Sequence, residues 1–149
     1  MLGIGKALGG LFRSAKKVEN RDLMEAILGG NLLVAASDGE IEKEESQKIE
    51  RLARSSDNLK HFGSEIPKAI QKMTDWLEAD FGLGRSRIMK EIRDVANNDE
   101  QVEEVMLNMI AVAKADGEVE PGERRVIEEI ARELGYRLSE EHFEIRKGA

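Results

Sequence analysis

The chain carries the stretch VAASDGEIEKEESQKIERLAR at residues 34–54 and a close copy, VAKADGEVEPGERRVIEEIAR, at residues 112–132. The second copy follows the first at a constant offset of 112 − 34 = 78 residues, with no gap. In each copy an Asp-Gly pair separates two segments of helical pattern, so we predict two helix–turn–helix units that pack about a pseudo-twofold axis. The residues of the first copy that recur in the second are Val34, Ala35, Asp38, Gly39, Glu40, Glu42, Glu45, Ile49, Glu50, Ala53 and Arg54.

Helical periodicity extends over the rest of the chain. Apolar residues recur three and four positions apart around residues 23–35, 49–53, 66–77, 88–95, 102–113 and 126–134, and no strand pattern of alternating β-branched residues occurs. We therefore predict an all-α fold of about seven helices in a compact bundle, counting one near the N-terminus. The expected boundary residues are Ser64, Gly82, Gly84, Gly135 and Ser139, as helix caps or breaks.

Composition excludes several classes of protein. The net charge of −7 disfavours binding to nucleic acid. The absence of cysteine excludes disulfides, zinc–thiolate sites and iron–sulfur clusters, and with them a direct reduction chemistry based on thiols. No run of 18 apolar residues is present, so no membrane-spanning helix is expected.

The first residues differ from the rest in charge. Residues 1–18 contain four basic side chains and no acidic one, interleaved with apolar residues. We interpret residues 1–19 as an amphipathic basic segment that could rest on an anionic membrane, with a packing helix or a loose tail as alternatives. Residues 20–149 are then the duplicated helical domain, with repeat copies at about 22–54 and 100–135.

Each copy contains Asp, Gly and, after five more residues, Glu. Gly can adopt the positive φ needed to leave one helix and enter the next, and Glu falls in the first turns of the following helix, where an acid is favourable. Oxygen-only ligands favour calcium, magnesium or manganese. The predicted divalent-cation ligands are Asp38, Glu45, Asp116 and Glu123.

This motif is similar to the second half of an EF-hand loop, but the first half is missing. Val34 and Ala36 stand where the first acidic ligands belong, and Val112 and Lys114 take those places in the second copy. A complete EF-hand is therefore not expected, whereas one site shared by both copies is. The alternative is that Asp-Gly and Glu serve only as turn and helix-start residues.

The sequence resembles the TerB family of bacterial tellurite-resistance proteins. The resemblance rests on VAASDGEIEKEE, LARSSDNLKHFG, FGLGRSRIMKEI and IAVAKADGEVEPGERRVIEEIARELGY, of which the last is the most specific. It implies an all-helical, duplicated domain with an acidic metal site, and it adds Glu40, Glu44 and Glu118 to the candidate metal ligands. Since Glu44 and Glu45 are adjacent, either could act in the first copy.

The resemblance also implies a role. It suggests a cytoplasmic, non-catalytic stress-response module that binds metal and interacts with other proteins, in particular a TerC-type membrane protein and TerD-type proteins, at or near the inner membrane. Two alternatives remain open on the residues alone. One is a metal-free structural adaptor, and the other is a carboxylate-bridged metal hydrolase, which the lack of His near the motif disfavours.

Overall fold

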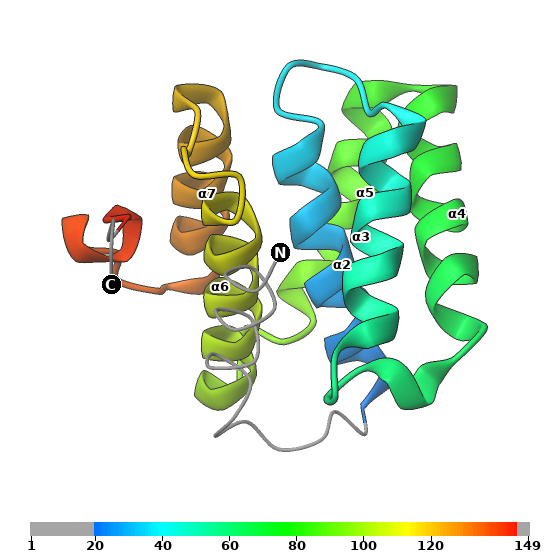
Figure 1. Ribbon diagram of the computed structural model, residues 1–149, viewed down its shortest axis with the longest axis horizontal. Coiled ribbons are helices and arrows are strands. Elements are labelled where there is room, and N and C mark those ends of the chain that lie inside the picture. The colour runs from blue at the N-terminus through cyan, green and yellow to red at the C-terminus, as the bar shows by residue number, and fades with distance from the viewer. Residues whose placement is uncertain (1–19, 146–149) are drawn as a thin grey trace.

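The structure is a computed structural model that describes residues 20–145. Within that range all regular structure is helical, as predicted (Figure 1). The elements are α2 (Arg21–Ala35), α3 (Lys43–Ser55), the 3-10 helix η1 (Lys60–Phe62), α4 (Glu65–Ala79), α5 (Phe81–Arg93), α6 (Asp99–Lys114), α7 (Pro121–Leu134) and the 3-10 helix η2 (Glu140–Phe143).

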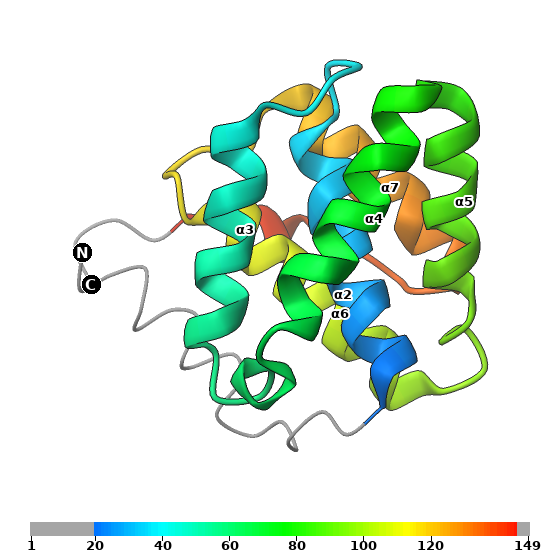
Figure 2. The ribbon, with the colours of Figure 1, turned by 90° about the vertical axis from the view of Figure 1, so that its right-hand side faces the viewer.

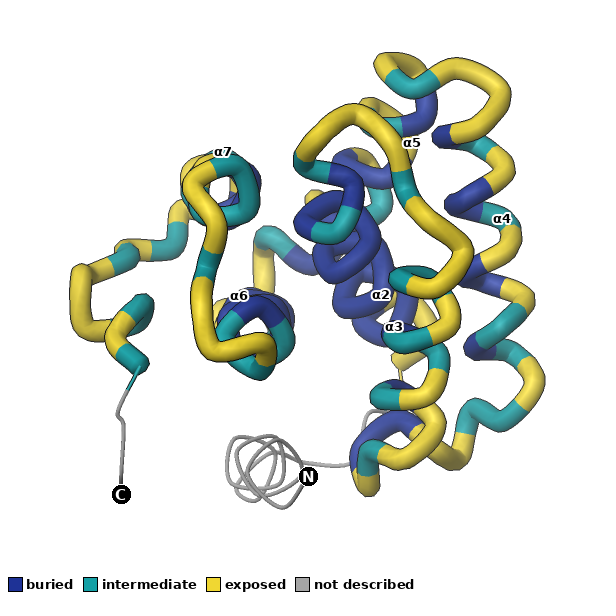
Figure 3. Tube along the Cα trace, turned by 45° about the horizontal axis from the view of Figure 1, so that its top comes forward, coloured by how far each residue is buried: buried dark blue, intermediate teal, exposed yellow. Residues whose placement is uncertain are grey.

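Helix α2 lies at the centre of the bundle. Its sequence, RDLMEAILGGNLLVA, is predominantly apolar after the first two residues, and every residue from Leu23 to Val34, including the polar Glu25 and Asn31, is buried (Figure 3). A helix that is apolar all round is stable only when it is covered all round. Accordingly, α2 contacts each of the other five α-helices of the described chain, with α6 and α7 on one side and α3, α4 and α5 on the other (Figure 1).

Two adjacent glycines allow this close packing around α2. A Cβ atom added to Gly29 would lie 2.9 Å from Ile88 Cγ2 on α5, and one added to Gly30 would lie 3.3 Å from Met109 Sδ on α6. A side chain at Gly29 would force its neighbour on α5 to shift, and one at Gly30 would require a smaller shift on α6, so the two glycines help to set how closely α5 and α6 approach the central helix.

The helix boundaries agree with the sequence except at two places. Gly135 ends α7 in the left-handed conformation with φ 69°, and Ser139 begins η2, both as expected. Ser64 occupies the N-cap position of α4, but its side chain makes no capping hydrogen bond.

The prediction that Gly82 and Gly84 separate two helices is wrong, because both lie inside α5. The break is at Asp80, whose side chain accepts a hydrogen bond from the Leu83 amide at 2.9 Å. Gly84 instead lies where α5 crosses the backbone of α4, and Figure 2 shows these two helices side by side.

The two copies of the repeated stretch form corresponding elements. Gly39 and Gly117 in the two turns both have positive φ, 98° and 86°. Helix α3 begins at Lys43 and α7 at Pro121, and 43 + 78 = 121, so the two helices start at equivalent positions of the repeat. In each copy the turn therefore delivers its acidic residues to the start of the second helix.

The basic segment expected at residues 1–19 lies outside the described residues. Among the helices of residues 20–145, none has the length and apolar character needed to cross a bilayer.

Candidate functional site

The ends of the two helix–turn–helix units meet at a small pocket. It has a volume of about 80 Å³, comparable to the space taken by a few water molecules. Helices α2, α3, α6 and α7 and the turn after α6 all contribute to its wall. We call it the acidic pocket, and its lining residues are Asn31, Val34, Ala35, Glu45, Lys48, Ile49, Val112, Ala113, Asp116 and Glu123.

Three of the seven predicted ligands line this pocket: Glu45 from the first copy, and Asp116 and Glu123 from the second. Of the adjacent pair, it is Glu45 that faces the pocket, while Glu44 is exposed. The pocket thus draws carboxylates from both copies, as a shared site requires.

The other predicted ligands lie outside the pocket. Asp38 is exposed, and its Oδ1 accepts a hydrogen bond from the Glu40 amide at 3.3 Å. It is nevertheless close enough for its charge to act on Glu45. Glu40 and Glu118 are exposed and do not line the pocket, so in this conformation they are solvated surface acids.

Burial and mutual repulsion affect two of the pocket carboxylates. The pKa of Glu45 is raised, first by burial and then by the charges of Glu42, Asp38 and Glu123, although a hydrogen bond from the Glu42 backbone opposes the rise. Both effects disfavour the ionised form. The negative charges of the two copies are therefore close enough to interact.

Glu123 behaves in the same way. Its pKa is raised by burial and by the charges of Asp116 and Glu120, while a hydrogen bond from the Glu120 backbone and the charge of Lys48 oppose the rise. The Glu120 amide donates that hydrogen bond to Glu123 Oε1 at 2.9 Å, as part of a capping box. Glu123 therefore also holds the start of α7.

Lys48 is the cation of the pocket. Its Nζ lies 2.5 Å from Asp116 Oδ1, an ion pair that joins α3 to the turn after α6. No three His, Cys, Asp or Glu side chains of residues 20–145 are grouped so that they could hold one metal ion. The pocket carboxylates lie near one another, but Asp116 already forms an ion pair with Lys48.

Asn31 is the most buried polar side chain of the pocket, with 5% of its surface exposed. Its Nδ2 donates to Ile27 O at 3.1 Å and to Asn108 Oδ1 at 2.7 Å. Because both neighbours are acceptors, the amide orientation is determined, and Asn31 Oδ1 is left buried without a hydrogen-bond partner. An orphaned buried acceptor is costly, and a hard cation is one group that would satisfy it.

Sequence reasoning missed both Lys48 and Asn31. The available signal for Asn31 was a polar residue inside an otherwise apolar segment, LGGNLLVA. The signal for Lys48 was a difference between the copies, because 48 + 78 = 126 and residue 126 is Val.

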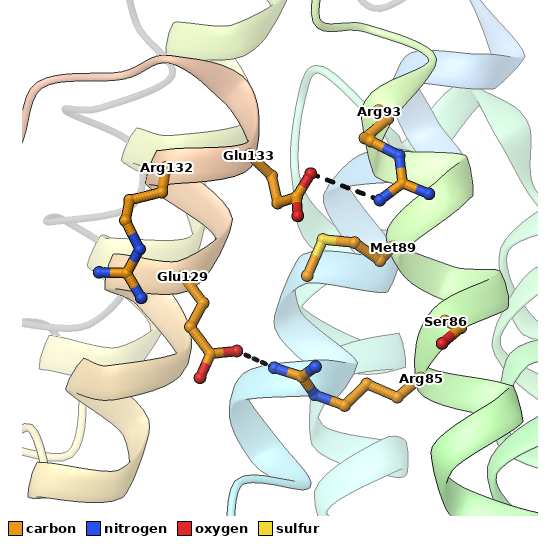
Figure 4. A pocket seen from close by; sticks show the side chains of 7 residues that line it. All are labelled: Arg85, Ser86, Met89, Arg93, Glu129, Arg132 and Glu133. Carbon is orange, nitrogen blue, oxygen red and sulfur yellow. Dashed lines mark hydrogen bonds and ion pairs between the residues drawn. The ribbon is translucent and has the colours of Figure 1, made fainter.

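A larger groove lies between α5 and α7, with a volume of about 470 Å³ (Figure 4). Two ion pairs cross it, one between Arg85 and Glu129 and one between Arg93 and Glu133 at 3.4 Å. We call it the arginine groove; Ser86, Met89 and Arg132 complete its lining. Each glutamate has its own guanidinium, so these charges link the two helices.

The comparison with protein families gives one clear result. The family model described as "Tellurite resistance protein TerB" matches residues 24–146. Neither the curated proteins nor the solved structures include a match to the chain. The matched range contains all six described α-helices except the first three residues of α2, together with every residue of the acidic pocket. The chain therefore belongs to the TerB family.

Proposed function

We propose that this protein is a cation-binding, non-catalytic module of the tellurite-resistance type, in which a divalent cation bridges the two helix–turn–helix units. The observation that carries the proposal is the acidic pocket, which is lined by Glu45, Asp116 and Glu123 from both copies and by Asn31, whose buried amide oxygen has no partner. These oxygen donors suit calcium, magnesium or manganese.

The donor atoms are of the kind that such an ion prefers, but no three acidic side chains of residues 20–145 are grouped to hold one ion, so binding would have to draw the pocket carboxylates together. Three carboxylates line the pocket, Asp38 stands beside them, and Asn31 Oδ1 offers a neutral ligand from the wall. Bound there, a cation would neutralise charges that otherwise raise the pKa of Glu45 and Glu123. It would also hold α3 and α7 in one relative position, which is how a small ion can control a protein-binding surface.

The TerB family match supports a role of this module in tellurite resistance. We infer that it works by binding other proteins, with a TerC-type membrane protein and TerD-type proteins as the expected partners and the cytoplasmic side of the inner membrane as the expected location. The basic residues of the segment 1–18 support contact with an anionic membrane.

Titration with Ca²⁺, Mg²⁺ and Mn²⁺, followed by calorimetry and thermal melting, tests the proposal. A cation that binds only the folded protein raises its melting temperature, by an amount that grows with its concentration. The double variant Glu45→Gln with Glu123→Gln should lose this response. If the unmutated chain binds none of these ions even at millimolar concentration, the proposal is rejected.

The matched control is Glu40→Gln with Glu118→Gln. It removes the same charge from the same two helix–turn–helix units, but at exposed positions outside the pocket. This variant should keep the response to the cation. Loss of the response in both double variants would mean that the ions act on the general negative charge of the surface.

The second candidate is a metal-free structural adaptor. It is favoured by the Lys48–Asp116 ion pair and by the absence, in residues 20–145, of three side chains grouped to hold an ion. It predicts that neutralising the pocket acids leaves partner binding unchanged, which pull-down of the TerC-type partner with the pocket variant would test.

A further inference from the structure

The two copies of the repeat differ in charge at one position of the acidic pocket. Lys48 in α3 corresponds to Val126 in α7, since 48 + 78 = 126. Val126 is a buried core residue with 8% exposure, whereas Lys48 is half-buried and lines the pocket. The second copy fills this position with a packing side chain, and the first fills it with an ammonium group.

That ammonium group occupies the place where a bound cation would act. Lys48 Nζ lies 2.5 Å from Asp116 Oδ1 and is close enough to Glu123 for its charge to counter the repulsion there. The pair joins residues 116 − 48 = 68 positions apart. An ammonium group and a divalent ion held on that one oxygen would lie close together, and the repulsion between their positive charges disfavours simultaneous binding.

Lys48 does not satisfy every acceptor of the pocket. Asn31 Oδ1, which is buried in the same wall, has no hydrogen-bond partner among the described residues. The pocket therefore contains a carboxylate, Asp116, that is ion-paired with Lys48, and a neutral oxygen, Asn31 Oδ1, that accepts no hydrogen bond. This combination points to a ligand that would use both.

We propose that Lys48 is a built-in competitor for the cation site, so that its ammonium group and a divalent cation bind Asp116 in mutually exclusive ways. The inference rests on the proposed cation binding at this pocket and adds its regulation. Without the divalent ion, Lys48 tethers α3 to the second Asp-Gly turn. With the ion, that tether is released and the ion links the copies through their carboxylates.

The same competition determines which ions can bind. A tethered ammonium competes at a high effective concentration, in the millimolar range or above, and carries the same charge as Na⁺ or K⁺. A monovalent ion gains no electrostatic advantage over it, whereas a divalent ion doubles the attraction to the carboxylates. The pocket should thus respond to divalent ions against a background of monovalent salt.

Calorimetric titration of the full chain, its Lys48→Met variant and its Lys68→Met variant tests this inference with Ca²⁺, Mg²⁺ and Mn²⁺ at constant ionic strength. Met keeps the apolar stem of Lys48 against the pocket wall. Lys68 is exposed on α4, away from the pocket, so its replacement changes the net charge equally. We expect about tenfold tighter binding for Lys48→Met and unchanged binding for Lys68→Met.

The outcomes separate this inference from the proposed function. Equal affinity of the unmutated chain and Lys48→Met, with both binding, overturns the competition and leaves the cation-binding function intact. Binding by Lys48→Met alone supports the competition but rejects cation binding as the function of the unmutated chain, because Lys48 then keeps the site closed. Binding by neither overturns both, provided that circular dichroism shows Lys48→Met to be folded.

Discussion

The arginine groove and the acidic pocket both lie between helices and both contain charged side chains, but their charges balance differently. In the groove, Glu129 and Glu133 each face one arginine. In the pocket, Lys48 pairs with Asp116 and its charge acts on Glu123, whereas the charges that act on Glu45 are all negative. In the groove the charges are balanced one to one and link α5 to α7. In the pocket a surplus of negative charge raises the pKa of Glu45 and Glu123 and opposes folding at neutral pH.

Gly84→Ala should disturb the packing of α5, which lines the arginine groove, and leave the acidic pocket intact. A Cβ atom there would lie 2.5 Å from the Trp76 carbonyl carbon and oxygen on α4, so α5 has to move. We expect a loss of about 3 kcal/mol in the free energy of unfolding, measured by urea denaturation. Since α5 contributes nothing to the pocket, binding of divalent cations should persist in the folded fraction.

Gly82→Ala is the control for that change. Gly82 is an exposed residue of the same helix, and a Cβ atom there would meet only Asp80 Oδ1, at an ordinary 3.7 Å. Ala should be neutral or stabilise α5 by up to about 1 kcal/mol. Equal destabilisation by both variants would show that the close approach of α4 and α5 is not the cause.

Asn108→Leu tests the buried hydrogen bond between Asn108 and Asn31 of the pocket wall, which has no counterpart in the groove. It removes the acceptor of the 2.7 Å hydrogen bond from Asn31, so a cost of about 1–2 kcal/mol is expected in urea denaturation. Replacing Asn31 by Leu as well should recover much of this cost, because no amide is then left unpaired. A double variant as unstable as the sum of both singles would contradict this account.

These residues also show what the sequence could and could not predict. The periodic apolar stretches predicted the helices. The acids repeated in both copies included three that line the acidic pocket, but also Asp38, Glu40 and Glu118, which do not. Gly135 was correctly expected to end α7. Such features depend on neighbours three or four positions away, or on a repeat that is visible in the sequence.

Contacts between distant residues were not predictable in this way. Asn31 pairs with Asn108 across 77 positions and Lys48 with Asp116 across 68, and nothing local in the sequence joins them. Gly84 was misinterpreted for a related reason. Its role is to let two helix backbones approach, and a glycine of that kind has the same sequence signature as a helix break.

The two ion pairs of the groove should contribute little and should not respond to divalent ions. A double-mutant cycle of Arg85→Met with Glu129→Gln should give a coupling of about 0.5–1 kcal/mol, since both side chains are partly exposed. Concentrated NaCl should reduce it. If millimolar Ca²⁺, Mg²⁺ or Mn²⁺ changed this coupling, the groove and the pocket would not be independent.

Glu45→Gln should give a small stabilisation when divalent ions are absent. Burial and neighbouring acids raise the pKa of Glu45 in the folded chain, so the folded state holds the Glu45 proton more tightly than the unfolded state does. The contribution of Glu45 to the free energy of unfolding is therefore full below its pKa in the unfolded chain, and it falls as the pH rises through its pKa in the folded chain. At neutral pH the neutral Gln avoids this loss, and we expect a rise of about 1–2 °C in melting temperature.

Exposed Glu44 is the control for Glu45. Glu44→Gln should leave the melting temperature almost unchanged, and the advantage of Glu45→Gln should disappear at a pH low enough to protonate the carboxyl in both states. A stabilisation that is independent of pH would trace to something other than the ionisation of Glu45.

The central position of α2 has a consequence for how the protein unfolds. Because α2 belongs to the first copy yet contacts every other α-helix of the described chain, its backbone amides can reach water only when the packing of both copies is lost. In hydrogen exchange, the amides between Ile27 and Val34 should therefore be the slowest, with an opening free energy equal to that of global unfolding. The duplicated units, although alike in sequence, are thus expected to unfold in a single cooperative event.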